Sequence, residues 1–236
     1  MDLSHYTTER DGGVSVSREQ ASRFAKSVAG DFNPIHDPDA RRFCVPGDLL
    51  FSVLLHRIGL HRRIAVDFTG MVDEHDTLRV DHTPERTALV DGDKTFLDAN
   101  HHGALPAEPA AVAALTAAYV SYSGQTFPHI LVPLWRAHGV MVNPARPMVM
   151  YRSMQLQLER ADLASVTLLP RNASMNVDGK KGAVTLPFDV ANADGTLVGH
   201  GEKHMLLSGL RAWEDDAVDG IVEAYDAAKR AWPKPA

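Results

Sequence analysis

An acid and an imidazole stand close together in the segment Gly30–Pro38, which reads Gly-Asp-Phe-Asn-Pro-Ile-His-Asp-Pro. The acid is Asp31 and the imidazole is His36. Both are side-chain types whose pKa values neighbouring groups can move toward neutrality. When the two side chains hold one water between them, they can take a proton from it and return one, as the addition of water across a double bond requires. The first hypothesis is therefore acid–base chemistry at Asp31 and His36.

A second chemical feature is the segment Val45-Pro46-Gly47-Asp48, which precedes the apolar run Leu49–Leu60. This run is apolar nearly all round, as is typical of a buried helix. We expect Asp48 to cap that helix and Gly47 to lie at its start. The N–H groups and dipole of a helix N-terminus favour an oxygen that gains negative charge during a reaction. A plain turn at Gly47 explains the residue equally well.

The elements that position these residues follow from periodicity. Ser17 and Gln20 form a capping-box pattern, and an apolar stripe then runs to Val28, so a helix is expected to end at Gly30. Alternating apolar residues between Ile64 and Leu97 predict four short strands, with a hairpin turn at Asp91-Gly92. These strands are expected to form an antiparallel sheet against the buried helix.

The same order of elements recurs in the second half of the chain. An Ala-rich helix ends at Ser123-Gly124, a loop with Pro128 follows, and a helix is expected over 130–138 before four more strand patterns. The sequence thus predicts an internal repeat, with a linker near 99–109. The predicted division is 1–105, 106–212 and a helical tail, 213–236, that serves only for packing.

Composition limits the classes of function. The net charge is −6 without a basic run, which argues against a nucleic-acid or anionic-membrane surface. One cysteine, Cys44, leaves no internal disulfide, and a buried inert thiol is favoured over a nucleophile. The neighbouring residues His36, Asp37 and Asp39, or His101 and His102, lack the spacing of a recognised metal site, so no metal is expected. No signal peptide or membrane span is visible, and a cytoplasmic protein is expected.

The segment Gly30–His36, followed by Pro46-Gly47-Asp48-Leu49-Leu50, resembles the hydratase motif of the MaoC-like hot-dog proteins, which include (R)-specific enoyl-CoA hydratases and acyl-thioester dehydratases. The whole chain resembles a bacterial subfamily of unassigned function. The resemblance implies an α+β double hot-dog fold, two curved antiparallel sheets each wrapped round a central helix. It further implies an acyl-thioester substrate, carried by coenzyme A or a carrier protein, as in fatty acid metabolism.

The resemblance also assigns roles to residues. Asp31 and His36 would activate one water, Asn33 would shape the loop, and the Gly47 amide would polarise the thioester oxygen. Two departures weaken the match. Asp48 places a negative charge near that oxygen, and the segment from His36 to Gly47 is short for a hydratase. In the second half, Gln125, Phe127 and Ile130 replace Asp31, Asn33 and His36, so only one site is expected per chain.

Alternative readings stay open. Asp31 and His36 also fit a loop whose polar groups satisfy only local backbone, and the chain could be a non-catalytic protein that binds an acyl thioester or another protein. In a thioesterase, the third reading, Asp48 would be the acid on the central helix. Arg41, Arg42, Arg62 and Arg63 fit either coenzyme A phosphates or a solvated surface. The hydratase hypothesis requires Asp31 and His36 to converge on one cavity beside the Gly47 amide, in a monomer or a homodimer and without a further cofactor.

Overall fold

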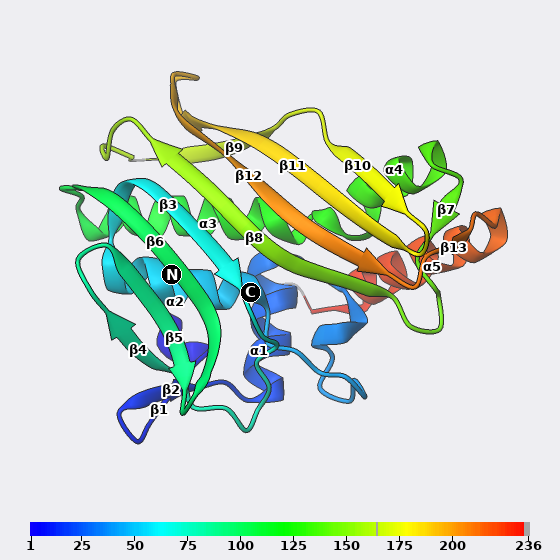
Figure 1. Ribbon diagram of the computed structural model, residues 1–236, viewed down its shortest axis with the longest axis horizontal. Helices are drawn as coiled ribbons and strands as arrows, with labels where there is room; N and C mark the ends of the chain where they lie inside the picture. The colour runs from blue at the N-terminus through cyan, green and yellow to red at the C-terminus, as the bar shows by residue number, and fades with distance from the viewer. Residues whose placement is uncertain (164, 234–236) are drawn as a thin grey trace.

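The computed structural model describes residues 1–163 and 165–233, which form an α+β fold around one large antiparallel sheet (Figure 1). The sheet runs in the order β10-β11-β12-β8-β3-β6-β5-β4, and β9 pairs with β11. Its strands from the first half of the chain are β3 (Leu60–Phe68), β4 (Arg79–His82), β5 (Arg86–Asp91) and β6 (Lys94–Leu105). Those from the second half are β8 (Met148–Leu158), β9 (Val166–Pro170), β10 (Ser174–Asp178), β11 (Lys181–Asn192) and β12 (Leu197–Ser208).

The two groups of strands meet where β3 pairs with β8, in a register that sets Ile64 opposite Leu156 and Val66 opposite Met154. Reading outward from this seam, each half places its first strand, its last strand and then its next-to-last strand. The predicted linker at 99–109 overlaps β6, which continues to Leu105 because Leu60 pairs with it. β10 was not predicted, because its short sequence lies between turn residues. The proposed domain boundaries remain a prediction.

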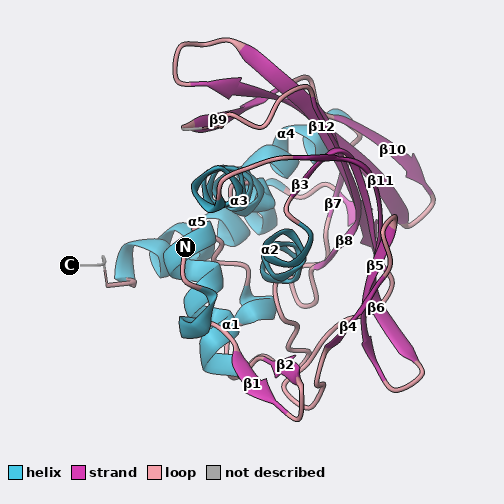
Figure 2. Ribbon diagram, turned by 90° about the vertical axis from the view of Figure 1, so that its left-hand side faces the viewer, coloured by secondary structure: helices cyan, strands magenta, loops and turns pink. Residues whose placement is uncertain are grey.

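Helices cover the concave face of the sheet, where α2 (Gly47–Ile58) and α3 (Pro109–Gly124) lie side by side (Figure 2). Phe51 of α2 meets Tyr119 of α3 with ring centroids 4.7 Å apart. The remaining helices are α1 (Arg18–Phe24), α4 (Leu131–Ala137) and α5 (Asp215–Ala231), with short or irregular turns at Leu3–His5, Ala25–Ala29, Pro34–His36 and Thr126–Ile130. Two further two-stranded sheets are formed by β1 (Thr8–Arg10) with β2 (Gly13–Ser15), and by β7 (Val140–Met141) with β13 (Arg211–Ala212).

The buried apolar residues form two clusters. The larger joins α1, α2 and α3 to the sheet and includes Phe24, Leu54 and Phe188. The smaller joins α4 and α5 to the second group of strands and includes Trp135, which is fully buried. The loop that carries Asp31 lies between them, since Phe32 belongs to the second cluster and Ala29 to the first.

The structure confirms the helix predicted to begin after Ser17, which is α1. Ser17 and Gln20 make both hydrogen bonds of a capping box. The helix then widens into an irregular turn over Ala25–Ala29 and ends at Gly30, whose φ of 68° is the left-handed conformation that glycine tolerates best. Gly30 therefore turns the chain directly into Asp31.

The structure corrects the expected start and end of α2. The helix begins at Gly47, with Pro46 as its N-cap, so Asp48 lies in the first turn and does not cap the helix. It ends at Ile58 because Gly59 takes a φ of 71° and Leu60 begins β3. The helix predicted over 130–138 is observed as α4 over Leu131–Ala137.

Candidate functional site

Asp31 and His36 face each other across the loop, with Asp31 Oδ2 3.7 Å from His36 Nε2. Asp31 Oδ1 accepts a hydrogen bond of 2.8 Å from the backbone N–H of Asn33. His36 Nδ1 lies 2.7 Å from the carbonyl oxygen of Cys44, which can only accept, so Nδ1 carries the proton that it donates. In the neutral form of the ring, the nitrogen without a proton is then Nε2, which faces Asp31. The separation of 3.7 Å is too long for a direct hydrogen bond, and one donor placed beside both acceptors could serve them together.

Asn33 shapes this loop. Its side-chain oxygen accepts a hydrogen bond of 3.3 Å from the Ile35 amide and caps the short turn Pro34–His36. Proline at the first position of that turn fixes the backbone without losing a needed donor. The two Asx-type bonds, from Asp31 and from Asn33, hold His36 on the same side of the loop as Asp31.

A cavity of about 270 Å³ opens beside this pair. It is bounded by the Asp31 loop, the first turn of α2, the end of α3, and strands β8 and β12. All five residues singled out in the sequence line it, namely Asp31, Asn33, His36, Gly47 and Asp48. Its apolar wall includes Leu50, Phe68, Val149 and Met205. The required convergence of Asp31 and His36 on one cavity with Gly47 is therefore present.

Gly47 is constrained by packing as well as by its place in the helix. A Cβ at this position would approach a ring carbon of Tyr151 to 2.9 Å, and the Tyr151 and Phe68 rings pack against each other beside it with centroids 4.3 Å apart and planes tilted by 36°. The close approach explains glycine here without reference to chemistry. Gly47 therefore presents only backbone to the cavity, which Asp48 and Leu50 of the same turn also line.

The carboxylate of Asp48 takes part in a buried chain of polar groups that sequence reasoning missed. Ser123 Oγ donates a hydrogen bond of 2.7 Å to Asp48 Oδ1, and Lys203 Nζ donates to Ser123 Oγ. Lys203 lies on β12 and is only 3% exposed. A signal was available, because Lys203 is in phase with the inward-facing apolar residues Met205 and Leu207, two and four positions further along the strand. Ser123 offered none, being a small residue on an Ala-rich helix.

Burial and charge shift the pKa values of two groups in the cavity. Burial raises the pKa of Asp31, and the nearby Asp48 carboxylate adds to this, whereas His36, the Asn33 amide and Lys203 oppose it. Burial lowers the pKa of Lys203, against the attraction of the Asp48 and Asp31 carboxylates. A raised pKa makes Asp31 better able to hold and return a proton near neutral pH.

Cys44 supplies a backbone carbonyl to the site and no reactive thiol. Burial raises the pKa of the Cys44 thiol to about 12, so the thiolate is scarce at neutral pH. The arginines considered for coenzyme A phosphates, Arg41, Arg42, Arg62 and Arg63, do not line the cavity, and Arg63 borders a separate groove with His102 and His200.

The second loop carries no matching pair. Gln125 is exposed, Phe127 is buried in the second cluster, and His129 lies 3.1 Å from Asp226 of α5. Gly124 packs so tightly on the first loop that a Cβ there would lie 1.9 Å from the Ala29 carbonyl oxygen. The second loop thus supports the first, and Asp31 and His36 have no counterpart in it.

The tail helix α5 contacts the segment that leads into Asp31. The Tyr225 hydroxyl donates a hydrogen bond of 3.0 Å to the Gly30 carbonyl, directly before Asp31, and the indole of Trp232 donates one of 3.1 Å to Ser27. These contacts tie the tail to the loop that carries the acid.

Tyr225→Phe tests this brace. We expect the free energy of unfolding to fall by about 1–3 kcal/mol, because the variant leaves the Gly30 carbonyl without its donor. Urea unfolding measures the change. The matched control is Tyr6→Phe, since the Tyr6 ring meets the Phe24 ring edge-on and no hydrogen bond of its hydroxyl is seen among the described residues. Equal stability of the two variants would contradict a bracing role for the Tyr225 hydroxyl.

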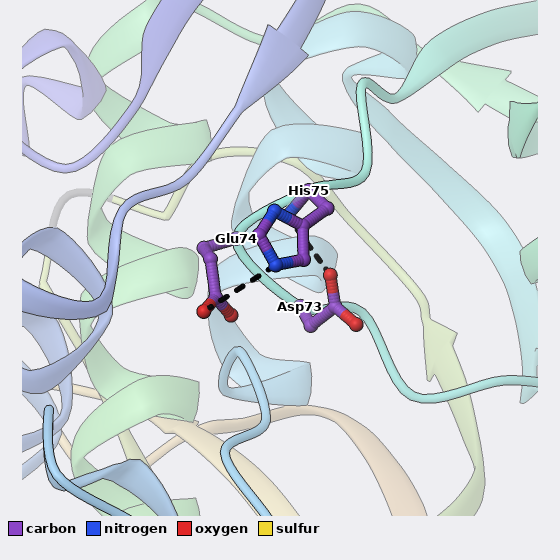
Figure 3. A group of neighbouring side chains, drawn as sticks. All are labelled: Asp73, Glu74 and His75. Atoms are coloured by element: carbon purple, nitrogen blue, oxygen red, sulfur yellow. Dashed lines mark hydrogen bonds and ion pairs between the residues drawn. The ribbon is translucent and has the colours of Figure 1, made fainter.

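The described residues contain one group of three neighbouring metal-type ligands, Asp73, Glu74 and His75 (Figure 3). His75 is exposed, and Glu74 is already paired with Arg18 at 2.6 Å. Exposed acidic groups of this kind are common without a metal, and this one lies outside the cavity lining. We attach no function to it.

Three histidines cluster on the inner side of the first group of strands. The His61 and His101 rings lie 4.4 Å apart, and the His82 ring stacks 5.8 Å from His101. Thr87 Oγ1 lies 2.7 Å from His82 Nδ1 and 2.9 Å from His101 Nε2. Within the described residues, Nδ1 of His101 has no hydrogen-bond partner. Burial, together with the smaller effect of the neighbouring histidines, lowers the pKa of His101 to about 4.

This cluster predicts acid sensitivity. The unfolded chain binds a proton at His101 below about pH 6.5, whereas the folded chain does not until about pH 4. Stability is therefore lost as the pH falls through that window, by at most about 3 kcal/mol at 1.36 kcal/mol per pKa unit. Urea unfolding at pH 7.5 and pH 4.5 should show a smaller loss in His101→Gln than in wild type. The exposed control His102→Gln should behave as wild type, and an unchanged loss in His101→Gln would refute the explanation.

No helix in the described part of the chain is both long and apolar enough to cross a lipid bilayer.

Fold and cavity together define an α+β protein in which one antiparallel sheet, built by both halves of the chain, carries helices on its concave face and an acid–imidazole pair beside a helix N-terminus. The chain belongs to the family described as "Protein of unknown function (DUF3581)", whose sequence profile matches residues 1–216. No curated protein matches the sequence.

Solved structures share part of this arrangement. The tesB protein of Mycobacterium avium subsp. paratuberculosis is 10% identical, with a TM-score of 0.47 over 87% of this chain and 97% of its own. A hot-dog-fold protein of unknown function from Alicyclobacillus acidocaldarius is 7% identical, with the same TM-score and coverage. The CurJ dehydratase is 9% identical, with a TM-score of 0.42 over 86% of this chain and 95% of its own. Similarity at this level carries no argument about the function of this chain.

Proposed function

We propose that the chain is a MaoC-like double hot-dog protein that acts as a hydratase or dehydratase on an acyl thioester, with Asp31 and His36 activating one water. The observation that supports this most directly is the geometry of that pair. Asp31 Oδ2 and His36 Nε2 lie 3.7 Å apart at a cavity that the start of α2 also borders.

In hydration, the water donates one hydrogen bond to Asp31 and one to His36. One of the two groups takes a proton as the water oxygen bonds to the β-carbon of the enoyl thioester. The electron pair of the double bond moves onto the thioester as an enolate. The proton then returns to the α-carbon, so one water supplies both the hydroxyl and the hydrogen. Dehydration is the same sequence reversed.

The enolate oxygen requires a donor, which the first turn of α2 supplies. Gly47 and Asp48 are the first two residues of the helix, whose opening N–H groups lie outside the intrahelical ladder. Such groups stabilise a developing oxyanion, and removing one donor typically costs about 2.7–4 kcal/mol of barrier. The reaction consumes only water and the thioester, so coenzyme A or a carrier protein enters as part of the substrate and no further cofactor is needed.

Purified protein offered crotonyl-CoA and longer trans-2-enoyl-CoAs tests the proposal. Hydration removes the conjugated double bond, so the ultraviolet absorbance of the enoyl thioester should fall with time. No turnover at any chain length by the folded protein would reject the hydratase and favour the alternative, a non-catalytic protein that binds an acyl thioester or another protein.

A thioesterase is the second candidate, because the acid Asp48 is buried on α2 and lines the same cavity. The same reactions should be followed with a thiol-reactive dye. Release of free coenzyme A without loss of the double bond would identify hydrolysis, whereas loss of the double bond without free thiol identifies hydration.

A further inference from the structure

Lys203 is a buried lysine to which the proposed reaction, as described so far, gives no role. Its side chain enters the cavity from β12 together with Asp31 and Gly47, and it is 3% exposed. None of the ion pairs among the described residues includes it. A buried charge without a carboxylate in contact is costly, so the remaining surroundings of the ammonium group are informative.

The hydrogen-bonding capacity of Lys203 is only partly filled. An ammonium group has three N–H donors. One goes to Ser123 Oγ, and the Tyr151 ring faces Nζ with its centroid 4.3 Å away. No further acceptor of Lys203 is found among residues 1–163 and 165–233. A donor thus remains for an oxygen atom that enters the cavity.

The position of Lys203 indicates which oxygen that is. Ser123 joins Lys203 to Asp48, and Asp48 follows Gly47 in the first turn of α2. Two hydrogen bonds through Ser123 therefore link the amino group of Lys203 to the side chain of Asp48, a residue in the first turn of α2. We propose that Lys203 and the start of α2 together bind the carbonyl oxygen of the acyl thioester, and hold it as it becomes an enolate. This inference rests on the proposed function and names a further residue for it.

The hydrogen-bonded chain from Lys203 to Asp48 also explains how a negative charge at Asp48 is compatible with an enolate nearby. A carboxylate beside an enolate oxygen would oppose the reaction by like-charge repulsion. Here the Asp48 carboxylate is hydrogen-bonded to Ser123 and turned toward a buried cation. Lys203 offsets its charge and adds attraction for the enolate, since a fixed charge acts strongly where water is excluded.

Kinetics of Lys203→Met provide the first test. We expect kcat for enoyl-CoA hydration to fall by about 10²–10³-fold, as for loss of one oxyanion donor, with a smaller change in KM. The control Lys181→Met removes an exposed lysine of the adjoining strand and should leave both constants unchanged. Near-wild-type kcat in Lys203→Met would overturn the proposal.

The double variant Asp48→Asn/Lys203→Met separates two roles for the lysine. If Lys203 binds the oxygen, the double variant stays as slow as Lys203→Met. If the lysine only neutralises Asp48, removing both charges restores turnover, and the proposal is overturned. Thermal unfolding of each variant, followed by near-ultraviolet circular dichroism, confirms that the compared proteins are folded.

A binding measurement without turnover distinguishes failure of this inference from failure of the proposed function. Acetoacetyl-CoA forms an enolate with its own ultraviolet band. A cation and a helix N-terminus at the carbonyl oxygen should favour that form, so the band should grow when wild-type protein binds it, and Lys203→Met should lose this effect. This result is expected even if no enoyl-CoA is hydrated. Failure of wild type to bind acetoacetyl-CoA or to enhance the band, or an equal band in Lys203→Met, would overturn the inference.

Discussion

Asp31→Asn should lower kcat for hydration of a trans-2-enoyl-CoA by about 10²–10⁴-fold, the usual contribution of a positioned acid or base. The asparagine side chain keeps an oxygen that can accept the hydrogen bond from the backbone N–H of Asn33, so the loop should hold its shape. It can neither take a proton from the water nor return one to the α-carbon. Initial rates with saturating crotonyl-CoA, or the longest thioester that turns over, measure the effect.

The controls for Asp31→Asn come from the same loop. Asp39→Asn changes an exposed acid nearby and should leave kcat unchanged. His36→Gln should lose activity to a similar degree, and the double variant with Asp31→Asn should be little slower than either single one, because groups that act as a unit are non-additive. Wild-type turnover in Asp31→Asn would disprove the mechanism, and losses that multiply would show that the two groups act separately.

Gly124→Ala should have the largest effect on stability. The added Cβ would lie 1.9 Å from the Ala29 carbonyl oxygen and 2.6 Å from the carbonyl carbon, both backbone atoms that cannot rotate away. Overpacking commonly costs about 1–3 kcal/mol, and a clash with backbone belongs at or above the upper end. Relief requires Ala29 and Gly30 to move, and Asp31 follows them. Turnover should therefore fall together with the free energy of unfolding.

The matched control for this variant lies in α5. Gly220→Ala adds the same methyl group in a helix where nothing lies within 4 Å of it. Because alanine is the better helix former by about 1 kcal/mol, Gly220→Ala should be neutral or stabilising. Urea unfolding compares the two with wild type. A Gly124→Ala protein that unfolds at the wild-type urea concentration would contradict the tight contact between the two loops.

Local residue patterns were sufficient to predict much of the scaffold. The capping box at Ser17 and Gln20, the left-handed glycine at Gly30 and the apolar α2 depend on neighbours a few positions apart, and each is present. The sequence also singled out Asp31, Asn33, His36, Gly47 and Asp48, which lie around one cavity. Local bonds within the loop bring Asp31 and His36 together, which is why a short segment could indicate them.

What only the tertiary structure decided involves residues far apart in the chain. Ser123 and Lys203 reach Asp48 from α3 and β12, and Tyr225 reaches Gly30 from α5, none of which any spacing rule connects. Asp48 itself was expected to cap α2, because an acid before an apolar run ordinarily does so. It bonds to Ser123 because the packing of α3 on α2 brings that hydroxyl within reach. The sequence by itself therefore determined the loop that pairs Asp31 with His36. Only the tertiary structure decided that Lys203 and Asp48 lie buried in the same cavity, because burial and long-range contacts exist only in the folded chain.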